Sequence, residues 1–201
     1  MKIDLRKELK HLYSPSTKEI IQVDVPDMKF LMVDGVGDPN TSQGYREAIE
    51  ALYSLSYALK FMVKKEKLID YTVMPLEGLW WMDDMTKFTS KNKSEWKWTA
   101  MIMQPQYVDE RAVAEALDQT RKKGLPALTK VRFEAFTEGL SAQTMHIGPY
   151  SSEEPTIMKI HDFIRRQGGE LSGKHHEIYL GDPRRSSPEK LKTVVRQPFK
   201  K

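Results

Sequence analysis

Two segments of this chain, 20–104 and 130–201, repeat one order of predicted elements, in which a strand leads into a helix and further strands follow. In each segment an apolar strand runs into a cluster of turn-forming residues, 34–40 in the first and 148–152 in the second, and a helix follows. The two clusters are weakly similar, so we interpret the segments as related halves packed with pseudo-symmetry. A duplicated sheet of this kind is expected to leave a cleft between the halves.

The first half contains a long predicted helix. Asn40, Thr41 and Ser42 are all suitable N-cap residues, and apolar side chains recur at helical spacing to about Lys65. The later elements of this half are strands at 69–74, 76–82 and 95–104, with a polar loop at 83–94. This loop is either a lid over the cleft or a connector. A bridging helix near 109–123 leads to the second half.

The second half is predicted to begin with two strands, 131–137 and 141–147, on either side of a turn at 138–139. Ser151 and Glu154 have the spacing of a capping box, which predicts the start of a helix. The remaining elements are this helix, which ends at 168–169, and strands at 175–181 and 193–199.

The composition fits one globular domain spanning residues 1–201. A hydrophobic content of 39% can build a core, and the absence of cysteine excludes disulfides, thiol catalysis and cysteine metal sites. The N-terminal residues lack the apolar core of a signal peptide, and no apolar stretch approaches the ~20 residues that span a bilayer. We therefore expect a cytoplasmic protein without a membrane partner.

The net charge of +4 comes largely from basic residues near the two ends of the chain. These residues are spread among acidic ones, and neither a helix-turn-helix pattern nor an aromatic RNA-binding motif accompanies them. A solvated basic surface is therefore favoured over direct binding of nucleic acid. No pattern in the sequence indicates an oligomeric state.

The tryptophans of the chain are clustered. They are Trp80, Trp81, Trp96 and Trp98. Indole faces stack on flat rings, and a carboxylate beside them, such as Glu77, can hold a cation or act as a base. The alternative is a tryptophan-rich sheet core. Trp81 shares the strand face of Glu77, whereas Trp80 points the other way and is assigned to the core; Met103 is either core packing or an adaptable pocket wall.

A second group of candidates lies near the C-terminus. His175, Glu177 and Tyr179 share one strand face, because alternate residues of a strand point the same way. Glu177 is either a ligand-binding acid or a structural acid paired with Arg132 or another base. His175 and His176 point to opposite faces, which is poor geometry for joint metal binding, so no metal site is expected.

Four runs of residues carry a family resemblance through their order and spacing. They are 34–53, His-Ile-Gly-Pro-Tyr at 146–150, His-His-Glu-Ile-Tyr-Leu-Gly-Asp-Pro-Arg-Arg at 175–185, and Pro-Glu-Lys-Leu-Lys-Thr at 188–193. Together they resemble the stand-alone members of the GyrI-like small-molecule-binding family over most of the chain. Regulators of this family carry a DNA-binding helix pair, and none is predicted before residue 30, so transcriptional control by this chain is not expected.

The resemblance implies an α+β fold of duplicated β-α-β-β modules of the SHS2 type. The modules are expected to have antiparallel sheets, helices on one side and a central ligand cleft. This cleft would take flat, amphipathic or cationic molecules, and Glu177 would read their positive charge among aromatic neighbours.

Some stand-alone relatives are similar to enzymes that hydrolyse cyclopropane-bearing DNA-alkylating natural products. For such a reaction Glu177 is the preferred base, because burial is expected to raise its pKa toward neutrality; Glu77 is the reserve base. Tyr179 is a candidate donor to the developing phenolate, and Tyr150 and His146 are others. Strain in the ring supplies driving force, so neither a metal nor an organic cofactor is expected.

Aromatic walls complete this predicted site. Trp81 and Trp98 are expected to stack on the substrate and orient it toward water. Two functional classes remain open, a xenobiotic hydrolase and a non-catalytic protein that sequesters or senses small molecules. A protein-interaction module is a third class, and it rests on fold analogy alone.

Overall fold

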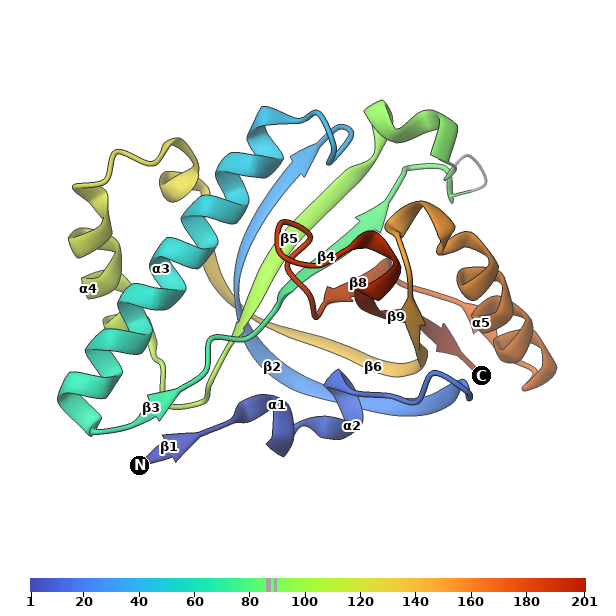
Figure 1. Ribbon diagram of the computed structural model, residues 1–201, viewed down its shortest axis with the longest axis horizontal. Coiled ribbons are helices and arrows are strands. Elements are labelled where there is room, and N and C mark those ends of the chain that lie inside the picture. Colours follow the sequence, from blue (N-terminus) through green and yellow to red (C-terminus); the bar gives the residue numbers. More distant parts are fainter. Residues whose placement is uncertain (86–87, 89) are drawn as a thin grey trace. The chain divides into compact units, whose positions relative to one another are not determined.

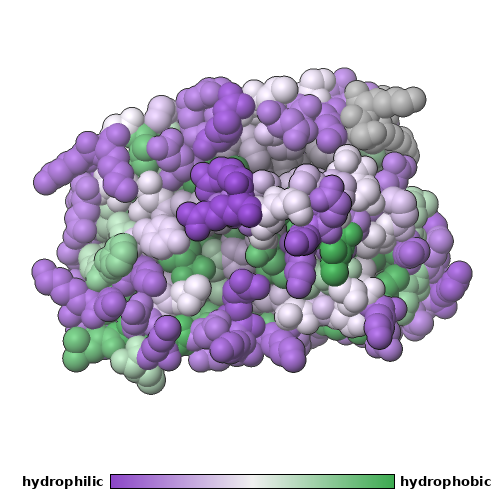
Figure 2. Space-filling model, viewed as in Figure 1, coloured by the Kyte–Doolittle hydropathy of each residue, from purple (hydrophilic) through white to green (hydrophobic). Residues whose placement is uncertain are grey.

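The computed structural model describes residues 1–85, 88 and 90–201, and it shows a mixed α+β fold with antiparallel sheets (Figure 1). Within this described part, no helix is both long and apolar enough to cross a membrane. Figure 2 shows hydrophilic side chains over much of the visible face, with apolar side chains in separate patches.

The chain forms two compact units. They are made of Met1–Glu8 with Met28–Phe136 (unit 1), and of Leu9–Asp27 with Thr137–Lys201 (unit 2). Two long strands, β2 (Ile21–Val36) and β6 (Arg132–Ile147), contribute residues to both units.

The sheet of unit 1 has β5 (Lys97–Gln104) at its centre. This strand pairs antiparallel with β2 on one side and with β4 (Leu76–Trp81) on the other. Met101 of β5 lies opposite both Met32 and Glu77, which defines the register. Every residue of β5 after the first is buried.

The long helix of unit 1 is α3 (Gln43–Lys67), which packs on β5. Ser42 caps it, because its hydroxyl accepts a hydrogen bond from the Tyr45 backbone N–H at 3.2 Å. Leu68 follows the helix with a left-handed φ of 56°. A second helix, α4 (Glu110–Arg121), packs along α3 (Figure 1). The fully buried stripe of α3 includes Leu52, Leu55 and Leu59.

The sheet of unit 2 has β9 (Lys192–Lys200) at its centre. It pairs antiparallel with β6 and with β8 (His175–Tyr179). The helix α5 (Glu154–Arg166) packs on β9. The core between this helix and the sheet consists of Ala142, Ile160, Ile164, Val195 and Phe199.

Short elements complete the two units. They are β1 (Lys2–Ile3), α1 (Leu5–Glu8), β3 (Asp70–Tyr71), η2 (Ser90–Glu95) and η3 (Pro126–Lys130) in unit 1, and α2 (Lys10–Tyr13), η4 (Tyr150–Ser152), β7 (Glu170–Leu171) and η5 (Pro188–Lys190) in unit 2. The loop expected at 83–94 includes 86, 87 and 89, which lie outside the described residues, so its role as a lid stays a prediction.

The order of elements agrees with the order expected from the sequence. Unit 1 contains β2, α3, β4 and β5 in that order, and unit 2 contains β6, α5, β8 and β9. In each set, the last strand pairs with the other two strands on either side of it. Gly37 and Gly148 follow the first strand of each set and both have positive φ, 114° and 137°, which glycine adopts readily. That the units are duplicated modules stays a prediction.

The prediction of a turn at Glu138 and Gly139 is wrong. The strand β6 runs through both residues without reversing, and Gly139 takes up the local distortion with a φ of 72°. The Glu138 carboxylate is buried against Arg196 and His176. These partners lie far along the chain, so local turn preference contains no information about them.

Two further local predictions differ from the structure. The expected capping box of Ser151 and Glu154 is wrong, because Glu153 occupies the N-cap position of α5 and no side chain caps the helix. The strand expected at 69–74 is reduced to β3, which pairs in parallel with β1.

Candidate functional site

A buried carboxylate, Glu177, lies between two polar neighbours on β8. His175 Nε2 and Glu177 Oε1 are 3.0 Å apart, and the Tyr179 hydroxyl donates a hydrogen bond to Glu177 Oε2 at 2.7 Å. The prediction that these three side chains share one strand face is therefore confirmed. Glu177 lies opposite Val195 of β9, which packs against Ile160. The polar cluster thus lies on the sheet face that α5 covers.

The Glu177 side chain is 14% exposed. Burial raises the pKa of this carboxyl. This effect is outweighed by the hydrogen bond and charge of His175 and, to a smaller extent, by Tyr179 and Glu153, so the pKa is lower than its ordinary value. The expectation that burial raises the pKa toward neutrality is therefore wrong, because hydrogen bonds to the charged form stabilise it. Glu177 is a carboxylate at neutral pH.

Tyr150 of η4 adds a second aromatic ring beside this cluster. Its ring centroid lies 5.4 Å from that of Tyr179, with the planes at 73°, an edge-to-face arrangement. Tyr150 is 38% exposed. A carboxylate bordered by partly exposed phenol rings suits a flat organic cation, because both the charge and the ring faces attract it.

A polar row crosses the sheet at the same level. Thr193 of β9 lies opposite His146 of β6 and Tyr179 of β8, so the three side chains point to one face. His146 is held by its own neighbours, with Nδ1 3.0 Å from Thr156 Oγ1 and Nε2 3.3 Å from Ser152 Oγ. The Thr193 hydroxyl is buried and has no hydrogen-bond partner among the described residues. A hydroxyl of this kind can bind a polar atom of a ligand.

Glu153 is a candidate that the sequence did not single out. Its side chain is buried, with the residue 3% exposed, and it contributes to lowering the pKa of Glu177 after His175 and Tyr179. The run Glu153-Glu154-Pro155 is typical of a solvated helix N-terminus, so the sequence pattern favours an exposed acid. The docking of α5 on the sheet is what brings Glu153 to Glu177.

The candidates expected in the first half lie in unit 1. Glu77 is fully buried in β4, Trp98 and Met103 are 2% and 4% exposed, and Trp81 is half-buried at the end of β4. Trp80 is 2% exposed, which confirms its assignment to the core. The predicted site residues are thus divided between Glu77, Trp81, Trp98 and Met103 in unit 1 and His146, Tyr150, Glu177 and Tyr179 in unit 2. A cleft shared by the two halves stays a prediction.

Arg132 was considered as a partner of Glu177, and the structure assigns it to other acids. Its Nη1 lies 2.7 Å from Asp34 Oδ2 and its Nε lies 2.9 Å from Glu134 Oε2. The pairing of Arg132 with Glu177 is therefore wrong.

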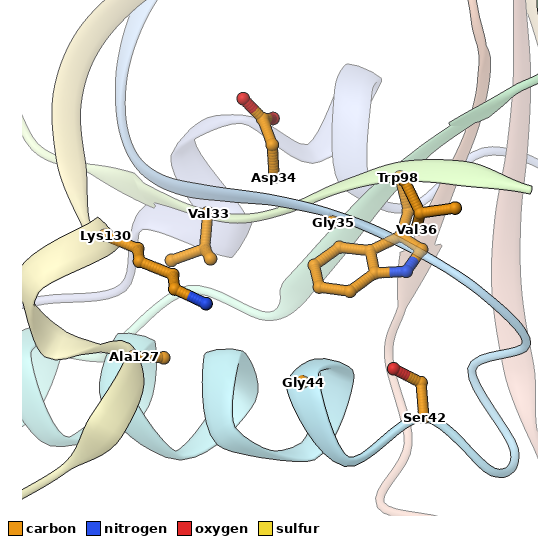
Figure 3. Close-up of a pocket in the computed structure, with 9 residues that line it drawn as sticks. All are labelled: Val33, Asp34, Gly35, Val36, Ser42, Gly44, Trp98, Ala127 and Lys130. Carbon is orange, nitrogen blue, oxygen red and sulfur yellow. The ribbon is translucent and has the colours of Figure 1, made fainter.

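Unit 1 contains a cavity of about 270 Å³ bounded by β2, β5, η3 and the start of α3 (Figure 3). It is lined by Val33, Asp34, Gly35, Val36, Ser42, Gly44, Trp98, Ala127 and Lys130. Figure 3 shows the Trp98 ring between β2 and α3, while the Asp34 carboxylate points away toward its partners Thr99 and Arg132. Gly35 makes room for this ring, because a Cβ at that position would overlap the indole. Trp98 therefore forms a wall of this cavity, and its contact with a ligand stays a prediction.

Comparison with known proteins places the chain in a family. The model of the GyrI-like small-molecule-binding domain matches residues 18–200. An uncharacterized conserved protein from Listeria innocua is 39% identical with a TM-score of 0.91, and a protein from the same organism described as a hydrolase is 37% identical with a TM-score of 0.85; each match covers 98% of this chain and 100% of the other.

A more distant structure shares the fold alone. The EcmrR C-terminal domain is 12% identical with a TM-score of 0.56, over 91% of this chain and 98% of that domain. No curated protein matches the chain.

Proposed function

The chain belongs to the GyrI-like small-molecule-binding family, and we propose that it binds flat amphipathic or cationic molecules and hydrolyses electrophilic ones, such as cyclopropane-bearing genotoxins. The observation that carries this proposal is the buried Glu177 carboxylate, held by His175 and Tyr179 beside the exposed ring of Tyr150. Two Listeria innocua proteins described as hydrolases, 37% and 38% identical over nearly the whole chain, support it.

The proposed reaction adds water to a strained ring. The water oxygen forms a bond to a cyclopropane carbon, a carbon–carbon bond of the ring breaks, and its electron pair moves through the conjugated system to a carbonyl oxygen. Glu177 accepts the proton lost by the water, the oxyanion takes up a proton from solvent to become a phenol, and Glu177 then returns its proton to solvent, so the net change is the addition of one water. A positioned base of this kind contributes about 10²- to 10⁴-fold in rate. The low pKa of Glu177 makes it a weak base, so ring strain has to supply much of the driving force.

Tyr179 is proposed to act both before and after Glu177 accepts the proton from water. Before the reaction its hydroxyl stabilises the charge of Glu177 through the 2.7 Å hydrogen bond. Once Glu177 has taken a proton, that charge is gone, and the Tyr179 hydroxyl can turn to the developing oxyanion. The ring of Tyr150 borders the same space and holds the flat part of the substrate.

The remaining predicted residues have proposed binding roles. In unit 2, His146 lies in the row that contains Tyr179 and supplies a polar edge. In unit 1, Glu77, Trp81, Trp98 and Met103 are proposed ligand contacts, on the architecture of duplicated SHS2-type modules with a central cleft that the resemblance implies.

Binding without catalysis is the second candidate function. The specific observation in its favour is the lowered pKa of Glu177, because a carboxylate that stays ionised is better suited to attract a cation than to remove a proton. A protein of this kind would sequester flat cations or report their presence.

Turnover of a duocarmycin-type substrate tests the proposal. The wild type is expected to convert the cyclopropane compound to a product heavier by one water, as measured by mass spectrometry. Glu177→Gln keeps the shape of the side chain and removes the base, so we expect a loss of about 100-fold or more in rate. Glu170→Gln, on an exposed acid of β7 in the same unit, is the matched control and keeps the wild-type rate.

The possible results separate the two functions. A wild type that binds the compound, seen as a change in its fluorescence, but never adds water is a binding protein. A Glu177→Gln variant that retains the full rate of hydrolysis removes Glu177 from the mechanism. A wild type that neither binds nor converts the compound overturns both candidates for this class of ligand.

A further inference from the structure

A serine and a histidine of unit 2 lie side by side, and the proposed ring opening uses neither as a nucleophile or a base. Ser152 Oγ lies 3.3 Å from His146 Nε2. The other ring nitrogen, Nδ1, lies 3.0 Å from Thr156 Oγ1. A hydroxyl beside one nitrogen of an imidazole, with the second nitrogen held by a third group, is the arrangement that activates a serine as a nucleophile.

Three elements bring these side chains together. His146 is the second-last residue of β6, Ser152 is the last residue of η4, and Thr156 lies in the first turn of α5. His146 is 8% exposed, whereas Ser152 is exposed. The imidazole is therefore held in place by its surroundings, while a molecule from solvent can reach the hydroxyl.

The absence of a side chain at Gly148 keeps the approach to this pair open. A Cβ at that position would lie 3.2 Å from Ser152 Oγ and 3.3 Å from His146 Nε2. Any larger side chain there would crowd both atoms. The backbone of Gly148 also has a φ of 137°, which glycine adopts readily.

The hydrogen of the Ser152 hydroxyl can reach the imidazole by a bond rotation. In the structure this hydroxyl donates to the Pro149 carbonyl at 2.8 Å. Rotation about the Cβ–Oγ bond directs the hydrogen to His146 Nε2 without moving a heavy atom. The 3.3 Å separation is long for a hydrogen bond, and contacts between a nucleophile and its base often shorten when a substrate binds.

We propose that Ser152 and His146 form a nucleophile–base pair that hydrolyses small aryl esters, an activity beyond the proposed ring opening. His146 Nδ1 carries the ring hydrogen and donates it to Thr156 Oγ1, so Nε2 is free to accept a proton. Tyr150 begins the short helix that ends at Ser152, and its ring makes an edge-to-face contact with Tyr179. An aromatic surface thus lies two residues from the nucleophile and favours an aryl ester.

The reaction transfers an acyl group to serine and then to water. Ser152 Oγ forms a bond to the ester carbonyl carbon while its proton moves to His146 Nε2, and an electron pair of the carbonyl moves to its oxygen. When the carbonyl re-forms, the bond to the phenolic oxygen breaks, and the phenol leaves with the proton from Nε2. Water then attacks the acyl carbon and gives a proton to Nε2, the bond to Ser152 Oγ breaks, and Oγ recovers that proton. The net change is one ester and one water to one acid and one phenol.

The start of α5 assists both additions. Ser152 lies two residues before this helix of 13 residues. The N-terminal end of a helix carries a partial positive charge, which stabilises the negative charge that develops on the carbonyl oxygen.

Hydrolysis of p-nitrophenyl acetate, followed by the absorbance of nitrophenolate, tests the proposal. Ser152→Ala and His146→Gln are each expected to lower kcat/KM by about 100-fold or more. Ser151→Ala changes the adjacent exposed serine and is the matched control, with the wild-type rate expected.

Covalent labelling separates activation of Ser152 from its mere presence. Phenylmethanesulfonyl fluoride forms a bond from sulfur to an activated serine oxygen and loses fluoride, and mass spectrometry of peptides locates the label. We expect the label on Ser152 in the wild type and in Ser151→Ala. His146→Gln keeps the hydroxyl but removes the base, so we expect no label there.

Thr156 is a positioning residue, and two substitutions test it. Thr156→Val removes the oxygen that holds Nδ1 and is expected to lower kcat while KM stays near the wild-type value. Thr156→Ser restores the oxygen and should restore kcat.

Three results would overturn the proposal. They are a wild type that does not hydrolyse the ester, a Ser152→Ala variant that keeps the full rate, and a sulfonyl label that is absent from Ser152 or persists there in His146→Gln. None of these measurements uses a cyclopropane compound or a cation, so their failure leaves the proposed function untouched.

Discussion

Replacing Glu138 with Gln should destabilise the protein strongly, because Glu138 belongs to a buried charge network in unit 2. Its Oε2 lies 2.9 Å from Arg196 Nη1 and its Oε1 lies 2.9 Å from His176 Nδ1. The Arg196 side chain is 1% exposed and also donates to Gln143 and to the Leu12 carbonyl. Glu138→Gln keeps the shape of the side chain but leaves the guanidinium buried without its counter-charge.

Two routes give a similar magnitude for this loss. Removing one member of a buried ion pair costs about 3 to 5 kcal/mol. Independently, burial raises the pKa of Glu138, but the charges of His176 and Arg196 outweigh burial and lower the pKa from 4.5 to about 2. A change of this size corresponds to roughly 3 kcal/mol, at about 1.4 kcal/mol for each tenfold change in proton affinity. We therefore expect Glu138→Gln to lower the free energy of unfolding by about 3 kcal/mol or more.

Urea unfolding followed by circular dichroism measures this difference, and pH provides a second check. Because the folded pKa is lower than the unfolded one, the stabilisation by Glu138 is complete above about pH 4.5 and is lost as the pH falls toward 2. The gap between wild type and Glu138→Gln should therefore narrow across this window. The control is Glu134→Gln, which breaks the half-exposed pair with Arg132 and should cost about 0 to 1 kcal/mol. A loss in Glu138→Gln no larger than in this control would refute the reasoning.

Two further predictions concern the aromatic packing of unit 1 and the charge of Glu177. Gly35→Ala places a Cβ against the ring of Trp98, so it should lower the free energy of unfolding by about 1 to 3 kcal/mol, as measured by thermal unfolding. The control is Gly44→Ala, whose Cβ would have its nearest side-chain atom at 3.8 Å, and it should be neutral or stabilising. Equal effects of the two substitutions would contradict the packing argument. Tyr179→Phe removes a hydrogen bond to the charged form of Glu177, so the pKa of Glu177 should rise. As the pH is lowered, binding of the flat organic cation N-methylacridinium should therefore be lost at a higher pH than in wild type. Tyr57→Phe, at an exposed tyrosine of α3 in unit 1, should leave this pH limit unchanged.

Features set by local sequence were predicted well. Ser42 was among three candidate caps for α3, and its hydroxyl does accept the Tyr45 N–H. The shared face of His175, Glu177 and Tyr179 followed from the two-residue period of a strand, and their hydrogen bonds confirm it. Each of these features depends on residues within a few positions of one another, so a periodic pattern contains the information.

Features set by distant partners were not predicted. Glu138 was assigned to a turn because Glu-Gly favours one locally, whereas in the continuous strand β6 its carboxylate binds Arg196 and His176, 58 and 38 residues away. The direction of the pKa shift of Glu177 was wrong for a related reason. Burial was expected to dominate, whereas the hydrogen bonds of His175 and Tyr179 to the charged form outweigh it. The strand period places these side chains on one face, but it does not say which ring atoms reach the carboxylate.

The two acids of unit 2 discussed above, Glu138 and Glu177, differ in their hydrogen-bond and charge partners. This difference supports a structural role for Glu138 and a functional role for Glu177. Glu138 faces a buried guanidinium that neutralises its charge, so a ligand cation has little to gain there. Glu177 is stabilised by an imidazole, a phenol and a second carboxyl, which satisfy its hydrogen-bonding capacity without a guanidinium or ammonium partner among its described contacts. Such a site keeps a negative charge beside aromatic rings. A binding site for organic cations requires that charge, and a hydrolase requires the same carboxylate to accept a proton from water.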